Sequence, residues 1–241
     1  MNFPTKRRAL ITGASSGIGK ATALAFAQAG VDVALVSRSQ EKLETVADAA
    51  RQAGVKAGVY PLDLAKVELV REGMSAIAAD FGPIDILVNN AGMGYTGTLM
   101  DTPLADWQQV MNLNLTSVFQ SIQGILPMMR QQGSGIIINV ASVAAYRAFP
   151  GWCAYNVSKA GLVALSKTLA EEERGSGIRV TTICPGSVNT PIWDTETVQA
   201  DFERSQMLTP EIVASSILQT ALLPQGAVIE EITLMPSAGA L

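Results

Sequence analysis

Residues 8–19, RALITGASSGIG, form the stretch that decides the fold of this chain. A short apolar run ends at Gly13, glycines recur at Gly17 and Gly19, and an alanine-rich run with helical character follows. The order of strand, glycine loop and helix start is typical of a phosphate site. Glycines let the backbone approach an anion, and the free amides of a helix N-terminus bind it. We therefore expect a parallel α/β fold built outward from this loop.

The spacing of the glycines separates this loop from two commoner phosphate loops. A P-loop has four residues between its first glycine and Gly-Lys-Ser/Thr, whereas five residues separate Gly13 from Gly19. The G-x-G-x-x-G loop fails because Thr22 stands where its third glycine belongs. The pattern present, T-G-x-x-x-G-x-G, is less common, and an ordinary glycine turn is its only rival. We expect cofactor phosphates against these residues: Gly13, Ser15, Ser16, Gly17, Ile18 and Gly19.

Apolar runs and amphipathic runs alternate along the rest of the chain. We expect further strands at 31–37, 55–62, 84–88, 136–141, 177–183 and 228–234. We expect further helices at 40–53, 67–81, 103–130, 154–174 and 210–223, the third of these being interrupted near 112–114. Strands that alternate with helices indicate a doubly wound parallel sheet with helices on both faces. The prediction is a single domain over residues 1–241.

Composition excludes several classes of protein. Hydrophobic residues make up 48% and charged residues 16% of 241, as in a compact globular chain. The net charge of -4, without long blocks of like charge, argues against a nucleic-acid partner. No apolar window is long enough for a membrane span, and no secretory signal follows the first basic residues. Cys153 and Cys184 lack metal-ligand spacing, so we expect reduced thiols in a cytoplasmic protein.

The chain contains no histidine. This excludes Ser-His-Asp and Cys-His catalysis as well as histidine-dependent metal sites, and we predict no metal centre. Residues 13–17 match the G-x-S-x-G elbow of hydrolases, but that elbow needs a histidine base. The match is therefore fortuitous.

Two strand ends bear on the choice of cofactor. In a dinucleotide fold the end of the second strand meets the adenosine ribose, where a carboxylate binds a 2′-hydroxyl and an arginine accommodates a 2′-phosphate. Ser37 and Arg38 stand there without a carboxylate, which favours NADP over NAD; a solvated arginine is the alternative. At the end of the third strand, Asp63 and Leu64 are placed to meet the adenine, although Asp63 equally suits a helix cap.

A tyrosine and a lysine are the candidate proton-transfer groups. Tyr155 and Lys159 are four residues apart in a helical run, so their side chains share one face. A nearby ammonium favours the phenolate and lowers the pKa of a phenol. Ser142, at the end of the strand 136–141, is placed to hold a carbonyl oxygen beside that phenol. Taken alone, the pair fits a surface tyrosine stacked on a lysine stem equally well.

Taken together, these motifs resemble the short-chain dehydrogenase/reductase family. The matching residues are Thr12, Gly13, Gly17, Gly19, Asn89, Asn90, Ala91, Gly92, Asn114, Ser142, Tyr155, Lys159, Pro185 and Gly186, in the order of the family. The resemblance implies a Rossmann-type sheet of seven strands. It also implies an Asn-Ser-Tyr-Lys catalytic group, made here of Asn114, Ser142, Tyr155 and Lys159, in which Asn114 keeps a water for proton transfer.

The same resemblance places the nicotinamide end of NADP(H). In this family the loop after the sixth strand passes the nicotinamide, and Thr190 stands where a threonine bonds its carboxamide. Lysine at the place of Lys159 holds the ribose hydroxyls. The residues implied for this end of the cofactor are Asn90, Ala91, Gly92, Tyr155, Lys159, Pro185, Gly186, Val188 and Thr190.

The expected function is NADPH-dependent reduction of a small-to-medium ketone or aldehyde, or oxidation of a secondary alcohol. A 3-oxoacyl-[acyl-carrier-protein] reductase is the first alternative. The acidic run 171–173 weakens it, because an acidic carrier protein needs basic neighbours, and so does the ending LMPSAGAL, which departs from the glycine-rich end of those reductases. A non-catalytic NADP-binding regulator is a distant alternative, since all four catalytic positions are filled.

Three further expectations concern the substrate and the assembly. Residues 190–208 are expected to form a short lid over the substrate. The aromatic residues expected near the tyrosine are Tyr95, Phe149, Trp152, Trp193 and Phe202, with core or interface packing as the alternative for each. The helix 154–174 is apolar on more than one face, around Leu162, Leu165 and Leu169, so we expect a homotetramer or homodimer.

Overall fold

The structure is a computed structural model that describes residues 7–200 and 203–239. Within them, seven strands form one parallel sheet in the order β3-β2-β1-β4-β5-β6-β7. The strands are β1 (Arg8–Thr12), β2 (Asp32–Ser37), β3 (Ala57–Pro61), β4 (Ile86–Asn89), β5 (Gly135–Val140), β6 (Ile178–Pro185) and β7 (Glu231–Leu234). The predicted doubly wound sheet is therefore confirmed.

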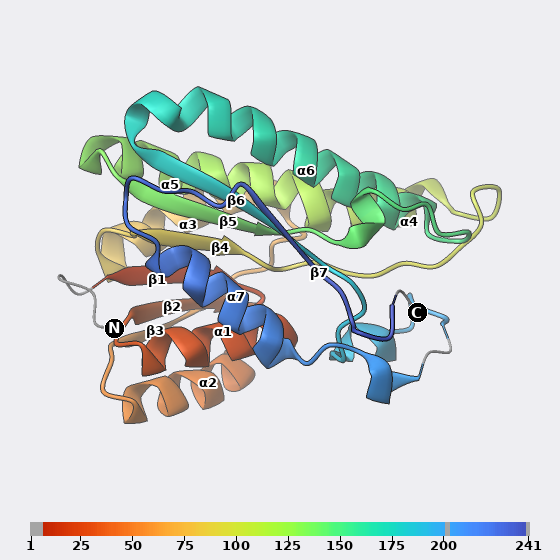
Figure 1. Ribbon diagram of the computed structural model, residues 1–241, viewed down its shortest axis with the longest axis horizontal. Coiled ribbons are helices and arrows are strands. Elements are labelled where there is room, and N and C mark those ends of the chain that lie inside the picture. The colour runs from red at the N-terminus through yellow and green to blue at the C-terminus, as the bar shows by residue number, and fades with distance from the viewer. Residues whose placement is uncertain (1–6, 201–202, 240–241) are drawn as a thin grey trace.

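Helices cover both faces of this sheet (Figure 1). They are α1 (Gly17–Gln28), α2 (Gln40–Gln52), α3 (Val67–Phe81), α4 (Leu104–Met111), α5 (Ser117–Gln132), α6 (Cys153–Glu173) and α7 (Pro210–Leu222). Helices α1, α2 and α7 pack on one face, and α3, α5 and α6 on the other, each layer enclosing its own apolar core. Because both faces are covered, β5 carries three successive buried isoleucines, Ile136, Ile137 and Ile138, with no alternation of polar residues between them.

Two predicted elements differ from the structure. The long helix expected at 103–130 consists of α4, a π-helical turn at Asn112–Thr116 and α5, so the interruption lies where it was expected. The last strand was predicted from residue 228 but begins at Glu231, and Val228 is 41% exposed. The pairing of β6 with β7 begins at Thr182 and Glu231, so the backbone at residue 228 lies before the paired part of the strand.

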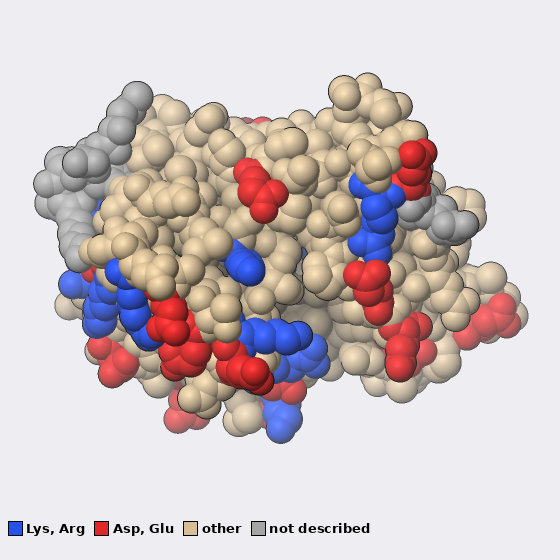
Figure 2. Space-filling view, turned by 90° about the horizontal axis from the view of Figure 1, so that it is seen from below, with Lys and Arg blue, Asp and Glu red and all other residues tan. Residues whose placement is uncertain are grey.

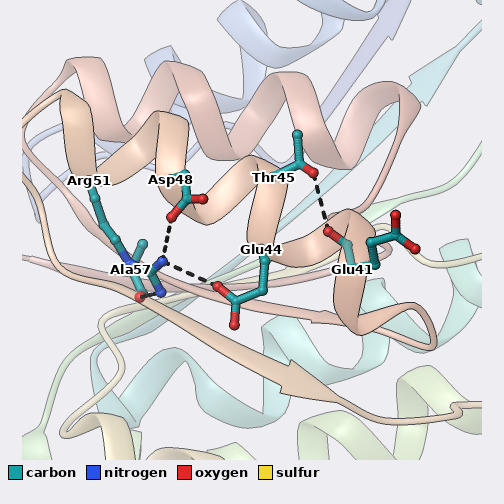
Figure 3. Close-up of polar contacts among 6 residues, drawn as sticks. All are labelled: Glu41, Glu44, Thr45, Asp48, Arg51 and Ala57. Carbon is teal, nitrogen blue, oxygen red and sulfur yellow. Dashed lines mark hydrogen bonds and ion pairs between the residues drawn. The ribbon is translucent and has the colours of Figure 1, made fainter.

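Helix α2 is fastened to the edge of the sheet by one arginine (Figure 3). The Arg51 guanidinium donates to Glu44 at 3.2 Å and to Asp48 at 2.8 Å on its own helix. It also donates to the backbone oxygen of Ala57 at 3.0 Å, at the start of β3. This contact ties the last turn of α2 to the start of β3, which pairs with the start of β2.

The order of the sheet reverses between β1 and β4, and this is where a doubly wound sheet opens a crevice at the carboxyl ends of its strands. The Thr12 hydroxyl accepts hydrogen bonds from the backbone amides of Asn90 at 3.0 Å and Ala91 at 3.1 Å. In return, the Asn90 side-chain amide donates to the backbone oxygen of Thr12 at 3.0 Å. The two loops that border the crevice are therefore tied to each other.

No helix within the described residues is long and apolar enough to cross a membrane.

Close contact between α3 and α5 depends on a glycine inside a helix. A Cβ atom at Gly124 would lie 2.6 Å from the backbone oxygen of Arg71 and 2.8 Å from the Cβ atom of Met74. Ser75 in α3 donates to the Gly124 oxygen at 3.0 Å, which keeps the two backbones together. Neither backbone can yield without separating the two helices.

We predict that Gly124→Ala lowers the free energy of unfolding by about 1–3 kcal/mol, the usual cost of overpacking. The helix propensity of alanine alone acts in the opposite direction, by ~1 kcal/mol. Gly161→Ala in α6 is the matched control, because its Cβ would meet only the mobile end of Leu115, at 2.9 Å. Urea unfolding of the three proteins measures both effects. Equal stability of Gly124→Ala and the parent chain would contradict the prediction.

Candidate active site

Tyr155 and Lys159 lie one turn apart near the start of α6, as the spacing predicted. Lys159 is 5% exposed, and its Nζ donates to the backbone oxygen of Val140 at 3.0 Å. The same Nζ lies 5.7 Å from the centre of the Tyr155 ring. The end of β5 therefore holds the ammonium beside the phenol ring rather than on its hydroxyl.

Ser142 lies in the same cleft as the phenol. It follows the end of β5 in extended backbone, and its hydroxyl accepts from the amide of Ala144 at 3.1 Å. Ser142 and Tyr155 both line this cleft, and Ser142 is close enough to lower the pKa of the phenol. The fold thus brings the two side chains together, although thirteen positions of sequence separate them.

Burial governs the acidity of these groups. Desolvation raises the pKa of Tyr155, and the hydrogen bond from Ser142 lowers it by less. Burial lowers the pKa of Lys159 to about 8, opposed by the charge interaction with Cys184. The sequence argument that Lys159 lowers the pKa of the tyrosine does not describe this structure, because the Lys159 ammonium is bonded to a backbone oxygen and its charged form is itself disfavoured.

Asn114 lies in the π-helical turn and is fully buried. Its Oδ1 accepts from the amide of Met93 at 2.8 Å, and its Nδ2 donates to the Met93 oxygen at 2.9 Å and to Ser158 at 3.1 Å. A Cβ at Gly92 would lie 3.1 Å from Asn114 Oδ1 and 3.5 Å from Lys159 Nζ. Both amide protons are therefore used by the protein, and only Oδ1 keeps room for a further donor.

The glycine loop has the form that a phosphate needs. Gly13 and Gly17 have φ values of +65° and +51°, and a Cβ at Gly19 would lie 2.3 Å from the oxygen of Gly13. Ser16 stands at the N-cap of α1 but makes no capping hydrogen bond, and the first turn carries no acidic residue. The amides at this helix start are available to an anion, so the loop fits a dinucleotide pyrophosphate.

The end of β2 lies beside this loop, because the amide of Ala14 donates to the oxygen of Val36. The Ser37 hydroxyl is buried and has no hydrogen-bond partner in the described protein, as expected of a group that awaits a ligand. Arg38 is exposed and makes no ion pair with any described residue. Both fit an adenosine ribose and its 2′-phosphate.

Asp63 and Leu64 follow β3 at the same edge of the sheet. Asp63 Oδ1 accepts from the amide of Ala65 at 3.1 Å, so its carboxylate closes a local turn. It does not cap α3, whose N-cap position is Lys66. Leu64 is buried. The carboxylate keeps its second oxygen for a ligand such as the adenine amino group.

Residues 190–200, the part of the predicted lid that the structure describes before its gap, reach across from the end of β6 to the loop after β4. The Thr197 hydroxyl donates to the backbone oxygen of Gly94 at 2.8 Å, and the backbone amide of Gln199 donates to the Thr96 hydroxyl at 2.7 Å. A Cβ at Gly17 would lie 3.1 Å from Thr190 Cγ2. The segment therefore contacts both the glycine loop and the loop after β4. Pro185 is the last residue of β6, and the backbone amide of Gly186 donates to the backbone oxygen of Leu234 in β7. Val188, two residues later, is buried.

A cleft of about 700 Å³, its open mouth included, lies over Ser142 and Tyr155. Figure 2 shows a face that is hollowed beside a gathering of Lys and Arg side chains. Of the predicted aromatic residues, three line the cleft, whereas Tyr95 is buried and donates to Asp106, and Phe202 lies outside the described residues. The lining residues are Gly94, Ser142, Val143, Ala144, Phe149, Trp152, Tyr155, Gly186, Ser187, Ile192, Trp193, Val198 and Met235.

Several of these lining residues escaped the sequence reasoning. Ser187, Val198 and Met235 come from three separate segments and carry no motif of their own. The signal that could have found Ser187 was its place directly after Pro185-Gly186 at a strand end, where side chains meet the crevice; its hydroxyl is buried there without a partner among the described residues. Met235, just past β7, had no local signal at all.

Two curated relatives and a solved structure resemble this chain. A 3-oxoacyl-[acyl-carrier-protein] reductase of Thermotoga maritima is 38% identical over 215 residues, covering 87% of each chain. A D-beta-hydroxybutyrate dehydrogenase of Rhizobium meliloti is 37% identical and covers 88% of this chain and 82% of its own. An alcohol dehydrogenase from Thermococcus sibiricus, complexed with 5-hydroxy-NADP, matches with a TM-score of 0.89 and 28% identity, over 98% of this chain and 99% of its own.

The model of the short chain dehydrogenase family matches residues 7–201. This region contains the glycine loop, the Thr12–Asn90 contact and the Ser142, Tyr155 and Lys159 group. The chain therefore belongs to the short-chain dehydrogenase/reductase family of oxidoreductases.

Proposed function

We propose that this protein reduces small-to-medium ketones and aldehydes with NADPH and, in reverse, oxidises secondary alcohols with NADP⁺. The observation that carries the proposal is that Ser142 and Tyr155 line an apolar cleft, with the buried Lys159 5.7 Å from the centre of the Tyr155 ring. The filled catalytic positions disfavour the non-catalytic regulator. The Cys153 and Cys184 thiols are free, which supports our further proposal of a cytoplasmic enzyme.

The bound cofactor supplies the hydride. We assign its phosphates to the loop of Gly13, Ser15, Ser16, Gly17, Ile18 and Gly19, and its adenosine end to Ser37, Arg38, Asp63 and Leu64. We assign its nicotinamide end to Asn90, Ala91, Gly92, Tyr155, Lys159, Pro185, Gly186, Val188 and Thr190. Residues 190–208, which already bridge to Gly94, act as the substrate lid.

Tyr155 donates the proton to the carbonyl oxygen, and Ser142 holds that oxygen by a hydrogen bond. The raised pKa of Tyr155 suits this role, because the phenol stays protonated at neutral pH until charge develops on the substrate. Lys159, with its pKa near 8, returns a proton to the phenolate and holds ribose hydroxyls. The Asn114 Oδ1, which has room for a second hydrogen bond, accepts one from a water molecule beside Lys159.

We also propose that the protein forms a homotetramer or homodimer, but we assign its subunit interface to other residues than those that the sequence suggested. Leu162 and Leu169 are covered by the sheet of their own chain, so they cannot face a partner. The exposed apolar side chains on this side of the sheet include Phe119 of α5 and Val157 of α6, each 42% exposed, and Leu69 of α3, 50% exposed; the first two belong to adjacent helices. They support an interface across these two helices.

We predict that Tyr155→Phe lowers kcat by ~10²–10⁴-fold, the usual contribution of general acid catalysis. The phenyl ring preserves packing, so NADPH should still bind with nearly the parent affinity. Oxidation of NADPH, followed by its absorbance, and fluorescence titration measure the two quantities. Tyr60→Phe, which removes a surface hydroxyl bonded to Asp80, is the control and should remain active. Near-normal turnover of Tyr155→Phe would refute the assignment.

We predict that the parent enzyme prefers NADPH and that Arg38→Ala raises KM for NADPH by about 10-fold or more, the loss of a charge-assisted hydrogen bond. KM for NADH should not change, because NADH has no 2′-phosphate. Arg71→Ala on α3, an exposed arginine, controls for the loss of a charge. A clear preference of the parent enzyme for NADH would overturn the role of Arg38.

Reduction of 3-oxoacyl thioesters is the second candidate function, favoured by the relative from Thermotoga maritima. The structure changes one argument against it. The acidic run at the end of α6 is not wholly on the surface, because Glu173 is fully buried and paired with Arg130, whereas Glu171 pairs with Arg174. Only part of that run is left to repel an acidic carrier protein.

We still predict a higher kcat/KM for simple ketones and keto esters than for acetoacetyl thioesters. The cleft is lined by apolar side chains, and no described residue along it offers the positive charge that a carrier-bound phosphopantetheine would meet. Parallel initial rates with NADPH and each substrate test this. A thioester rate far above the ketone rates would establish the second function instead.

A further inference from the structure

We propose that the cleft selects carbonyl compounds whose non-reacting substituent is a neutral aromatic ring, held in a corner formed by the indoles of Trp152 and Trp193. This inference rests on the proposed carbonyl-reducing function and names the class of substrate for that site. The corner is made by residues far apart in sequence: Trp152 precedes α6, and Trp193 lies in the segment that crosses the cleft.

The two indoles form a continuous aromatic wall that leads to the candidate acid. The ring of Trp152 lies 5.5 Å from that of Tyr155, with 69° between their planes. The ring of Trp193 lies 6.0 Å from that of Trp152, again at 69°. Both indoles line the cleft. A third aromatic ring placed in this corner gains edge-to-face contacts on top of the burial of its own surface.

Hydrogen bonds within the protein position both tryptophans. The Trp193 indole N–H donates to the backbone oxygen of Val188 at 2.7 Å, so its polar edge is satisfied without a ligand. The backbone of Trp152 donates to the oxygen of Phe149 at 3.1 Å and bridges to Gly97. A side chain fixed in advance, as the Trp193 indole is by this bond, loses little entropy when a ligand binds. Both tryptophans present part of their ring surface to the cleft.

The remainder of the cleft excludes charge. Val143, Ala144, Phe149, Ile192 and Met235 line it, and none of its described lining residues is charged. The Arg204 guanidinium on the crossing segment is bonded to Asp194 at 2.6 Å and to Asn189 at 3.0 Å. A carboxylate on the substrate would lose its hydration without gaining a partner of opposite charge, because the polar lining residues Ser142, Tyr155 and Ser187 offer only neutral hydroxyls. The substituent must therefore be neutral as well as flat.

The decisive experiment compares acetophenone with cyclohexyl methyl ketone, two methyl ketones of similar size that differ in aromatic character. We expect Trp193→Leu to lower the ratio of their kcat/KM values by about fivefold, which corresponds to the aromatic contact alone. The intrinsic reactivity of each ketone cancels, because the same two ketones are compared in both proteins. Trp193→Phe should keep most of the ratio, and Trp152→Leu should lower it as Trp193→Leu does.

Tyr60→Leu removes an aromatic ring from β3, the edge strand of the sheet, and is the matched control; its ratio should equal that of the parent enzyme. A second pair tests charge: 4-acetylbenzamide should exceed 4-acetylbenzoate, its charged isostere, by about 10-fold or more in kcat/KM. The affinity for NADPH, measured in every variant, reports whether the site as a whole has stayed intact.

Two failures are distinguishable. If the parent enzyme oxidises neither NADPH nor NADH with any of these ketones, the proposed function fails. If it reduces them but the ratio is the same in Trp193→Leu, Trp152→Leu and the parent enzyme, carbonyl reduction stands and the aromatic corner is refuted. Preference for the carboxylate over the amide would likewise refute the inference.

Discussion

The contact between Thr12 and Asn90 is the constraint on which the site depends. One hydroxyl at the end of β1 accepts two backbone amides from the loop after β4, and the Asn90 amide bonds back to β1. These bonds lie just beyond the last paired residues of β1 and β4, where the order of the sheet reverses, and they join the two loops that follow these strands. They bring the glycine loop against Ala91, and a Cβ at Gly13 would lie only 2.9 Å from its Cα atom.

Burial rather than charge pairing sets the chemistry of the site. Lys159 donates to the oxygen of Val140 and is almost fully buried, so its amine titrates near 8. The same burial raises the pKa of Tyr155 and keeps the phenol protonated. A phenol that holds its proton, beside an amine that can replace it, suits an enzyme that donates protons to carbonyl oxygens. A cation next to a phenolate would suit alcohol oxidation better.

Local patterns predicted the parts of the fold that local physics controls. The glycine spacing predicted a tight loop before a helix, and the structure has one, because a positive φ at Gly13 and close backbone approach at Gly19 leave no substitute for glycine. The break near Asn114 was visible because a polar amide stood among apolar positions, and the structure has a π-helical turn there. The acidic run 171–173 looked like an exposed charged surface, but Glu173 is buried and pairs with Arg130, which lies on another helix and could not be identified from the local sequence.

The sequence by itself determined the order of the elements, the family, and the identity of the Ser142, Tyr155 and Lys159 group, since each follows from residue types at fixed spacing. Only the tertiary structure decided what surrounds that group. Trp152, Trp193 and Met235 meet in one cleft although they belong to three segments, and the acidity of Lys159 depends on how deeply it is buried. The physical reason is that spacing acts within one helix or strand, whereas desolvation and the shape of a cleft arise from elements that are distant in sequence.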